Sequence, residues 1–312
     1  MKLPKRVEIV EVGPRDGLQN EKDLIATGDK IELINRLSRT GLKHIEITSF
    51  VNPRWIPQLA DSAQVATTID RLPGVTYSAL VPNLKGYEQS VSAQIDTIVV
   101  FLSASESHSR KNINKSIAEA EVVLKEVTTR AIADGKRVRC YISTVFGCPY
   151  EGDADPEVTV RLTEEILGWG AYQVAISDTT GVANPQQVQD VLQRLYDRGI
   201  RADQLALHVH DTRGTALANI LAALQMGITT FDSSIGGLGG CPYAPGATGN
   251  VATDDLNYLL QSMGIETGVD SDKLFDASCF MQHTLAKKLP SRYFQSQLAA
   301  CSEGSKSNAN AT

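Results

Sequence analysis

Two histidines two positions apart, His208 and His210, have the residue type and spacing that most directly suggest chemistry in this sequence. They follow the apolar run QLAL, which begins at Gln204 and is typical of a β-strand. Because side chains alternate between the faces of a strand, both imidazoles would lie on one face, about 6–7 Å apart, within reach of one metal ion. The chain has only 5 histidines, so this spacing favours a ligand pair over two unrelated histidines, one buried and one exposed.

Segments typical of strands and helices alternate along most of the chain, and these elements must position the two histidines. We expect strands at residues 7–12, 44–48, 76–81, 97–102, 138–144, 173–177, 205–210 and 229–233. We expect helices at residues 28–38, 57–70, 84–92, 116–133, 156–168, 185–198, 215–225, 254–263 and 272–288. Eight strand–helix units within about 260 residues predict an α/β protein, a (β/α)8 TIM barrel with an extra C-terminal helix. A doubly wound open sheet is the alternative, which the lack of a glycine-rich phosphate turn after the first strand disfavours.

Domain organisation and composition indicate a single-domain protein and exclude several kinds of partner. No linker splits the chain, so we expect one barrel domain over residues 1–295 and a flexible C-terminal tail over residues 296–312. The net charge of −6 favours neither nucleic acid nor an anionic membrane surface as a partner. No apolar run is long enough to span a membrane, and a strand-like segment that begins at Val7 leaves no room for a signal peptide. The five cysteines are scattered without CxxC pairing, so we expect a reduced, cytoplasmic protein.

Polar residues follow the predicted strands at the carboxyl-terminal end of the barrel, where the active sites of this fold lie. Asp16 follows the first strand, and Asn250 lies beyond a glycine-rich segment after the eighth. With His208 and His210 they offer two nitrogens and two oxygens, a set that suits Mg²⁺ or Mn²⁺ and would also accept Zn²⁺. Arg15 is a fixed cation beside this set that could stabilise a developing enolate. For Asp16 taken alone, the alternative is a turn residue.

Three further carboxylates and one thiol each have two interpretations. Glu46 lies within an apolar strand, so it either takes part in a reaction or forms a structural ion pair with Arg15. Asp178, at the end of the sixth strand, is either a site residue or a turn carboxylate, whereas Asp211 fits a helix cap better. Cys241 lies in the glycine-rich stretch GGLGGCPY and is either a mobile acid or base, or an inert small residue.

The residues assembled so far resemble those of the hydroxymethylglutaryl-CoA lyases, in a wider family of metal-dependent lyases and acyl-transfer synthases on TIM barrels. The resemblance covers nearly the whole chain, from about residue 7 to 290, whereas the HxH pair alone would be shared with the synthases. It implies divalent-metal-dependent cleavage of 3-hydroxy-3-methylglutaryl-CoA to acetyl-CoA and acetoacetate, with Mg²⁺ or Mn²⁺ as the cofactor. The matching segments are Glu11–Glu21, Thr48–Pro57, Pro82–Glu88, Lys111–Asn114, Gly147–Gly152, Asp178–Val182, His208–Thr212 and Gly236–Thr253.

The resemblance also implies a role for individual residues. The implied metal ligands are Asp16, His208, His210 and Asn250. Arg15 is similar to the catalytic arginine, and Glu46 and Asp16 to the residues that orient or deprotonate the C3 hydroxyl. Cys241 is similar to a loop thiol that helps protonate the acetyl-CoA carbanion. The implied contacts to the substrate, including its coenzyme A portion, are Arg15, Ser49, Lys111, Asn112, Arg139 and Asp178. We expect an acyl-CoA thioester as the substrate and a homodimer or larger homo-oligomer as the assembly.

Two positions depart from the family pattern near the expected substrate site. Ala175 stands where the family has a substrate-contacting serine, and Arg213 stands where it has tyrosine after HVHDT. These changes keep the 3-substituent of the acyl-CoA open, so a citramalyl-CoA-like or isoprenoid-derived substrate is the first alternative. An acetyl-CoA-dependent condensing synthase is less favoured, because the chain lacks the long C-terminal region expected of one. A catalytically silent scaffold would lack some of the site residues, and all are present.

Overall fold

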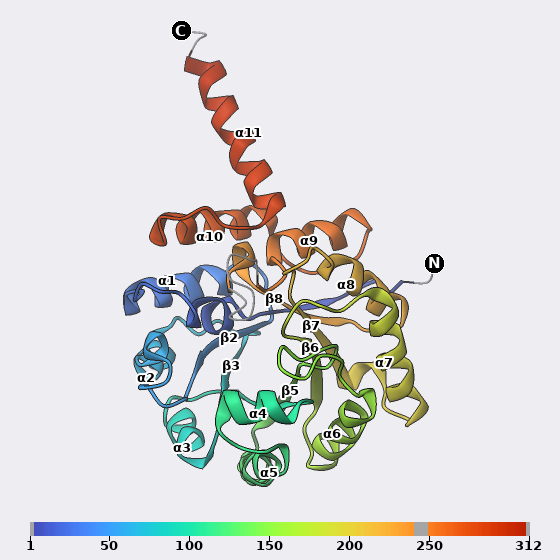
Figure 1. Cartoon of the computed structure of the whole chain (residues 1–312). Coiled ribbons are helices and arrows are strands. Elements are labelled where there is room, and N and C mark those ends of the chain that lie inside the picture. The colour runs from blue at the N-terminus through green and yellow to red at the C-terminus, as the bar shows by residue number, and fades with distance from the viewer. Residues whose placement is uncertain (1–2, 240–248, 310–312) are drawn as a thin grey trace.

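Eight parallel strands close into a barrel in the order β1 to β8, with β1 paired to β8. The structure is a computed structural model that describes residues 3–239 and 249–309. Figure 1 looks along the barrel and shows the helices as a ring around the strands. The strands are β1 (Glu8–Glu11), β2 (His44–Ser49), β3 (Thr76–Leu80), β4 (Thr97–Ser103), β5 (Arg137–Ser143), β6 (Gln173–Asp178), β7 (Leu205–Val209) and β8 (Thr230–Ser233). The predicted (β/α)8 TIM barrel is confirmed.

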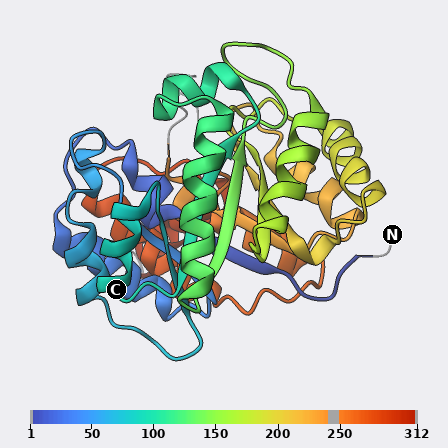
Figure 2. The ribbon, with the colours of Figure 1, turned by 90° about the horizontal axis from the view of Figure 1, so that it is seen from below.

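The helices follow the strands in the order that the sequence predicts. The α-helices are α1 (Thr27–Ser38), α2 (Ser62–Thr68), α3 (Leu84–Ser92), α4 (Glu106–Ile113), α5 (Ile117–Ala133), α6 (Pro156–Gly168), α7 (Pro185–Asp197), α8 (Ala216–Gln225), α9 (Thr253–Ser262), α10 (Ser271–Thr284) and α11 (Arg292–Ala309). Short helical turns are η1 (Gly13–Gly17), η2 (Pro57–Leu59), η3 (Ala202–Gln204) and η4 (Ile235–Gly237). The helix expected at residues 57–70 is divided into η2 and α2, and α4 was not expected. Figure 2 shows α4 and the segment between β5 and α6 together at one end of the barrel.

Side-chain caps and one tightly packed glycine explain where several of these elements begin and end. Helix α5 starts with a capping box in which Ser116 and Glu119 satisfy each other's backbone N–H groups. Helix α1 is followed by Gly41, whose φ of +99° lies in the left-handed region. A Cβ at Gly41 would collide with the backbone carbonyl oxygen of Gly268, so this position requires glycine.

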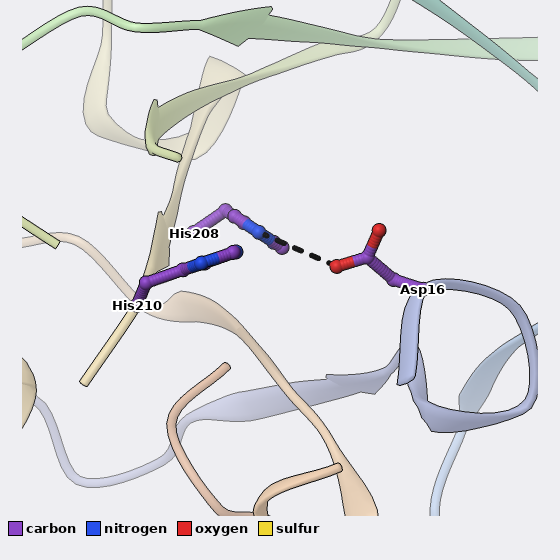
Figure 3. Close-up of side chains that lie close together, drawn as sticks. All are labelled: Asp16, His208 and His210. Carbon is purple, nitrogen blue, oxygen red and sulfur yellow. Dashed lines mark ion pairs between the residues drawn. The ribbon is translucent and has the colours of Figure 1, made fainter. Parts of the chain in front are cut away.

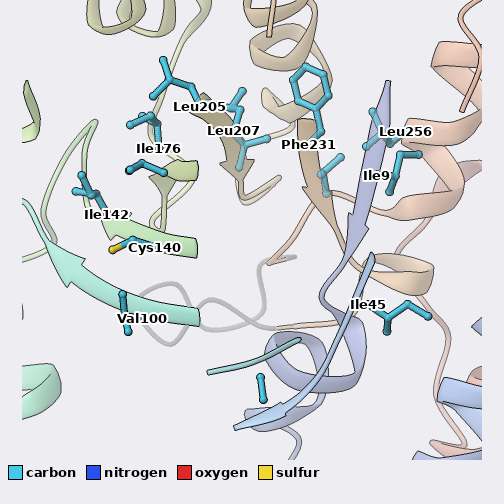
Figure 4. Packing of buried hydrophobic residues seen from close by; sticks show 14 of the residues in the cluster. Ile9, Ile45, Val100, Cys140, Ile142, Ile176, Leu205, Leu207, Phe231 and Leu256 are labelled. Carbon is cyan, nitrogen blue, oxygen red and sulfur yellow. The ribbon is translucent and has the colours of Figure 1, made fainter. Parts of the chain in front are cut away.

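The main hydrophobic core lies between the strands and the surrounding helices. Figure 4 shows side chains such as Ile9, Ile142 and Phe231 in this layer. A much smaller apolar cluster fills part of the barrel interior, where Tyr141 and Ala175 pack with Leu80, Val99 and Ala206. The other buried interior positions include charged side chains, among them Glu46, Arg139 and Asp232. Because buried charges are costly without partners, the polar interior points to a functional use of the barrel.

The C-terminal segment differs from the sequence expectation. Residues 296–309, expected to belong to a tail, continue helix α11, which projects away from the barrel in Figure 1. The first turns of α11 are fixed by side-chain packing, since Phe294 contacts Phe275 of α10 and Tyr293 stacks on Tyr258 of α9. A helix can therefore start here although the residues after Cys301 are small and polar. Among the described residues, no helix is both long and apolar enough to cross a membrane.

Candidate active site

The turn that follows β1 carries two site residues of opposite charge. Residues Gly13–Gly17 form one turn of π-helix, closed by the carbonyl of Val12, which accepts hydrogen bonds from Asp16 N (2.7 Å) and Gly17 N (3.3 Å). Arg15 and Asp16 are consecutive in this turn and form an ion pair with each other. The turn therefore delivers a cation and a carboxylate to the carboxyl-terminal end of the barrel as one unit.

Both histidines come from the end of β7 and face Asp16, as the sequence predicts. Their ring centroids lie 5.3 Å apart, and Nε2 of His208 lies 4.0 Å from Oδ2 of Asp16 (Figure 3). One ligand atom from each of Asp16, His208 and His210 lies within 4.8 Å of the other two. Asn250 is joined to the same group, because it pairs with His210 through a β-bridge and its Nδ2 donates to Asp16 Oδ2 at 2.8 Å. The four residues expected to share a metal ion are thus brought together.

The electrostatic state of these residues fits a divalent cation. Burial alone would raise the pKa of Asp16, but Arg15 and the two imidazoles outweigh it and lower the pKa to about 2. Burial lowers the pKa of His210 to about 4, so its ring is neutral near pH 7. The Nδ1 of His210 is buried and has no hydrogen-bond partner among the described residues. An ionised carboxylate, an unpartnered imidazole nitrogen and an amide form a donor set that a divalent cation would satisfy.

Arg15 is held by a second carboxylate from the neighbouring strand. Its guanidinium forms an ion pair with Glu46 of β2, whose other oxygen accepts a hydrogen bond from the hydroxyl of Tyr141 at 2.9 Å. The guanidinium carbon also lies 5.5 Å from the centre of the Tyr141 ring. The structure contains the Arg15–Glu46 ion pair that was the alternative interpretation of Glu46. This pairing fixes the direction of the guanidinium while its partner Asp16 remains beside the histidines.

Two aspartates near the site have backbone partners. Asp178 accepts hydrogen bonds from the N–H groups of Val182 (3.0 Å) and Ala183 (2.9 Å), which is the turn role that was its alternative. Asp211 accepts from the N–H of Ala216 at the start of α8, as expected of a cap. Both carboxylates therefore stabilise the segments that follow β6 and β7.

The residues expected to contact the substrate occupy different environments. Arg139, which was expected to contact the substrate, has no exposed side-chain surface, and its guanidinium is paired with Asp232 inside the barrel. Ser49 is also buried, and its hydroxyl has no hydrogen-bond partner among the described residues. Lys111 and Asn112 are exposed on α4, with Lys111 Nζ 3.7 Å from the ring centre of Tyr150. Cys241 lies outside the described residues.

The two departures from the family pattern do not bring new charge to the metal-ligand group. Ala175 is fully buried in the interior cluster with Tyr141 and Ala206. The guanidinium of Arg213 donates to the carbonyls of Thr180 and Gly181, each at 2.9 Å, and so supports the segment after β6.

Three buried polar residues around the site were not identified from the sequence. Glu11 accepts hydrogen bonds from the N–H groups of Gly13 and Ile235, Tyr141 donates to Glu46, and Asp232 contacts His208. The signal was present for Glu11, which lies beside Ile9 and Val10 in β1, and was weaker for Asp232, whose strand β8 has the sequence TFDS. A carboxylate at such a position needs a partner or a purpose.

The fold and this cluster define the class of the protein: a (β/α)8 barrel with a candidate metal centre at the carboxyl-terminal ends of its strands. A family model described as HMGL-like matches residues 6–281. The hydroxymethylglutaryl-CoA lyase YngG of Bacillus subtilis is 56% identical over 95% of this chain and 98% of its own. The chain therefore belongs to the HMGL-like family, among the hydroxymethylglutaryl-CoA lyases, which are carbon–carbon lyases.

Solved structures of family members agree with this assignment. The crystal structure of the Bacillus subtilis HMG-CoA lyase matches with a TM-score of 0.93 at 56% identity, over 95% of this chain and 99% of that one. An HMG-CoA lyase from Acinetobacter baumannii, in complex with coenzyme A and 3-methylmalate, matches with a TM-score of 0.89 at 38% identity. That match covers 94% of this chain and 95% of the Acinetobacter chain.

Proposed function

We propose that this protein cleaves 3-hydroxy-3-methylglutaryl-CoA to acetyl-CoA and acetoacetate, with Mg²⁺ or Mn²⁺ as its cofactor. The observation that carries the proposal is the convergence of Asp16, His208 and His210, with ligand atoms within 4.8 Å of one another, beside the Arg15 cation. The identity of 56% to a curated HMG-CoA lyase supports the choice of substrate. Asn250, joined to Asp16 and His210, completes the proposed ligand set.

The reaction breaks the C2–C3 bond of the acyl chain. The proton of the C3 hydroxyl passes to Asp16, the C3 oxygen becomes the ketone of acetoacetate, and the bonding electron pair moves to C2 of the thioester as an enolate. A divalent cation held by the four ligands would acidify and orient the C3 hydroxyl. Arg15, already fixed by Glu46, offers its positive charge to the oxygen on which negative charge develops. Because Glu46 is committed to Arg15 and Tyr141, we assign it to orienting the arginine, and we assign Asp16 to orienting the hydroxyl and accepting its proton.

A proton must then reach C2 to give acetyl-CoA. We assign this step to the thiol of Cys241, which a glycine-rich segment carries. Lys111 and Asn112 are our candidates for contacts with the coenzyme A portion, supported by their exposure on α4, which follows the carboxyl-terminal end of β4. Ser49 is a further candidate because its buried hydroxyl lacks a partner among the described residues. We further propose that the protein is cytoplasmic. We also propose that it is a homo-oligomer, which light scattering on the purified protein would test.

The parent substrate is favoured over a relative with a different 3-substituent. Ala175 lies in the apolar interior cluster, and Arg213 uses its guanidinium on backbone carbonyls. Within the described residues, neither departure therefore forms a hydrogen bond or ion pair with the four proposed metal ligands or with Arg15. A citramalyl-CoA-like substrate therefore remains the outcome that would correct the proposal.

The test is an assay of metal-stripped protein that is reloaded with Mg²⁺ or Mn²⁺. A panel of 3-hydroxyacyl-CoA thioesters is supplied, and acetyl-CoA and the released keto acid are both measured. We expect fastest release from 3-hydroxy-3-methylglutaryl-CoA, with acetoacetate as the second product, and none from the Asp16→Asn variant. Pyruvate released from citramalyl-CoA at a higher rate, or turnover that does not respond to metal, would overturn the proposal.

A further inference from the structure

A buried ion pair lies directly behind one of the two site histidines. Asp232 of β8 accepts from Nη2 of Arg139 through Oδ1 at 2.7 Å and from Nη1 through Oδ2 at 3.1 Å. The same Oδ2 lies 3.3 Å from Nδ1 of His208. Neither Arg139 nor Asp232 has any exposed side-chain surface. The bidentate geometry therefore places a charge-compensated carboxylate against the imidazole edge that faces away from Asp16.

The position of this carboxylate is fixed from several sides. The Nε of Arg139 donates to Gln173 Oε1 at 2.9 Å, and Nη1 also donates to the Tyr141 hydroxyl at 3.1 Å. The Tyr141 ring meets His208 edge-on, with centroids 5.5 Å apart. Because Arg139 is held at three points, its partner Asp232 has little freedom to turn away from His208. Such an arrangement determines which ring nitrogen of the histidine carries the proton.

His208 and His210 differ in whether Nδ1 of the ring has a hydrogen-bond partner. His208 has an anionic acceptor at Nδ1, whereas Nδ1 of His210 is buried without a partner among the described residues. With a proton on Nδ1 donated to Asp232, His208 has a lone pair on Nε2, the atom that lies 4.0 Å from Asp16. Resting on the proposed metal-dependent function, we propose that Asp232, clamped by Arg139, is a positioning residue that fixes His208 as the Nδ1–H tautomer and aims its Nε2 lone pair at the metal site.

The first test needs no variant at the proposed residue. Histidine labelled with ¹⁵N is incorporated into the metal-free protein, and the ring nitrogens are observed at about pH 8.5, where imidazoles are neutral. A His208→Gln sample assigns the signals. We expect His208 to carry its proton on Nδ1. A proton on Nε2 in the wild-type protein would overturn the proposal, whatever the enzyme turns over.

The second test compares two variants that each remove the carboxylate partner of a buried cation. Asp232→Asn affects Arg139, and the control Asp61→Asn affects Lys30, whose Nζ lies 3.0 Å from Asp61 outside the barrel. Mn²⁺ affinity is measured by electron paramagnetic resonance without substrate, and thermal stability is measured in parallel. We expect Asp232→Asn to weaken Mn²⁺ binding about 10–100-fold, with wild-type affinity in Asp61→Asn.

The outcomes separate this proposal from the proposed function. If both variants lose stability but both bind Mn²⁺ as the wild type does, Asp232 has only a structural role and the proposal fails. If Asp232→Asn binds weakly and its kcat recovers at high Mn²⁺, the positioning role is supported. If the wild-type protein binds Mn²⁺ but cleaves no acyl-CoA, the proposed function fails while the role of Asp232 toward the metal stands.

Discussion

Glu11 is a buried acid whose removal should change the pH dependence of stability in a calculable way. Its side chain is fully buried at the end of β1 and accepts hydrogen bonds from Gly13 N (2.7 Å), Ile235 N (2.8 Å) and Thr253 Oγ1 (2.6 Å). Burial raises the pKa of Glu11 to about 8, an effect that these hydrogen bonds only partly offset. One carboxyl group thus connects the turn that bears Arg15, the turn η4 at which the glycine-rich segment begins, and the start of α9.

The direction in which pH changes the stability of the wild-type protein through Glu11 follows from proton linkage. Below pH 4.5, the ordinary value, Glu11 is protonated in both the folded and the unfolded chain. Between pH 4.5 and about 8, the unfolded chain has lost this proton while the folded protein retains it, so stability falls as pH rises. The slope approaches about 1.4 kcal/mol per pH unit, and the whole interval corresponds to at most roughly 5 kcal/mol. Glu11→Gln cannot ionise and should lack this loss.

The assay is urea unfolding of the wild type and Glu11→Gln at about pH 5.5, 6.5 and 7.5, with a chelator present throughout. Glutamine can keep the geometry, since its carbonyl can accept from Gly13 and Ile235 and its amide can donate to Thr253. We expect the variant to gain about 2–3 kcal/mol relative to the wild type between the first and last pH. Glu32→Gln, at an exposed ion pair with Arg36, is the control and should follow the wild type. Parallel curves for wild type and Glu11→Gln would refute the reasoning.

Three further predictions follow from the site and the fold. Arg15→Gln removes the cation beside Asp16 and should lower kcat about 10²–10³-fold at saturating Mn²⁺, and a rate within threefold of the wild type would contradict the role of Arg15. Chelation should lower the melting temperature by about 4 °C if metal was present at about 100 times its Kd, because the ion stabilises only the folded protein. Calorimetry of Asp16→Asn should show no such change. Gly41→Ala should lower the free energy of unfolding by at least about 2 kcal/mol more than Gly74→Ala does. Both glycines have positive φ, but only a Cβ at Gly41 would meet a backbone oxygen. Equal losses of stability in the two variants would contradict the predicted collision at Gly41.

The barrel was predictable because its strands are short apolar runs separated by helix caps and glycines. The predicted strands agree with the observed ones to within about two residues at each end. Helix α4 was missed because its sequence, ESHSRKNI, is polar on all sides and has no apolar period. Its start depends on Ser105, which accepts a hydrogen bond from the N–H of His108. Helix α11 was missed because its first turns depend on Phe275 and Tyr258, which are distant in sequence.

The ligand cluster was predictable for a different reason. His208 and His210 could be identified because residues two positions apart at the end of a strand lie on one face of it. Asp16 could be identified because it follows the predicted end of the first strand. The supporting acids were not predictable in the same way, because a carboxylate in a strand does not indicate its partner. Asp232 meets Arg139 across 93 positions of sequence, and Glu11 meets Thr253 across 242. Only closure of the barrel brings these groups together.

The position of Arg15 and Asp16 in a single π turn restricts how this enzyme can diverge. Lengthening or shortening that turn would displace both charges at once, so the proposed binding of the ion by Asp16 and the proposed stabilisation of the enolate by Arg15 could not be adjusted separately from within it. Separate adjustment has to come from outside the turn, through Glu46 for the arginine and Asn250 for the aspartate. Changes of reactivity during evolution are therefore expected to accumulate on β2 and after β8, while the turn itself stays constant in length.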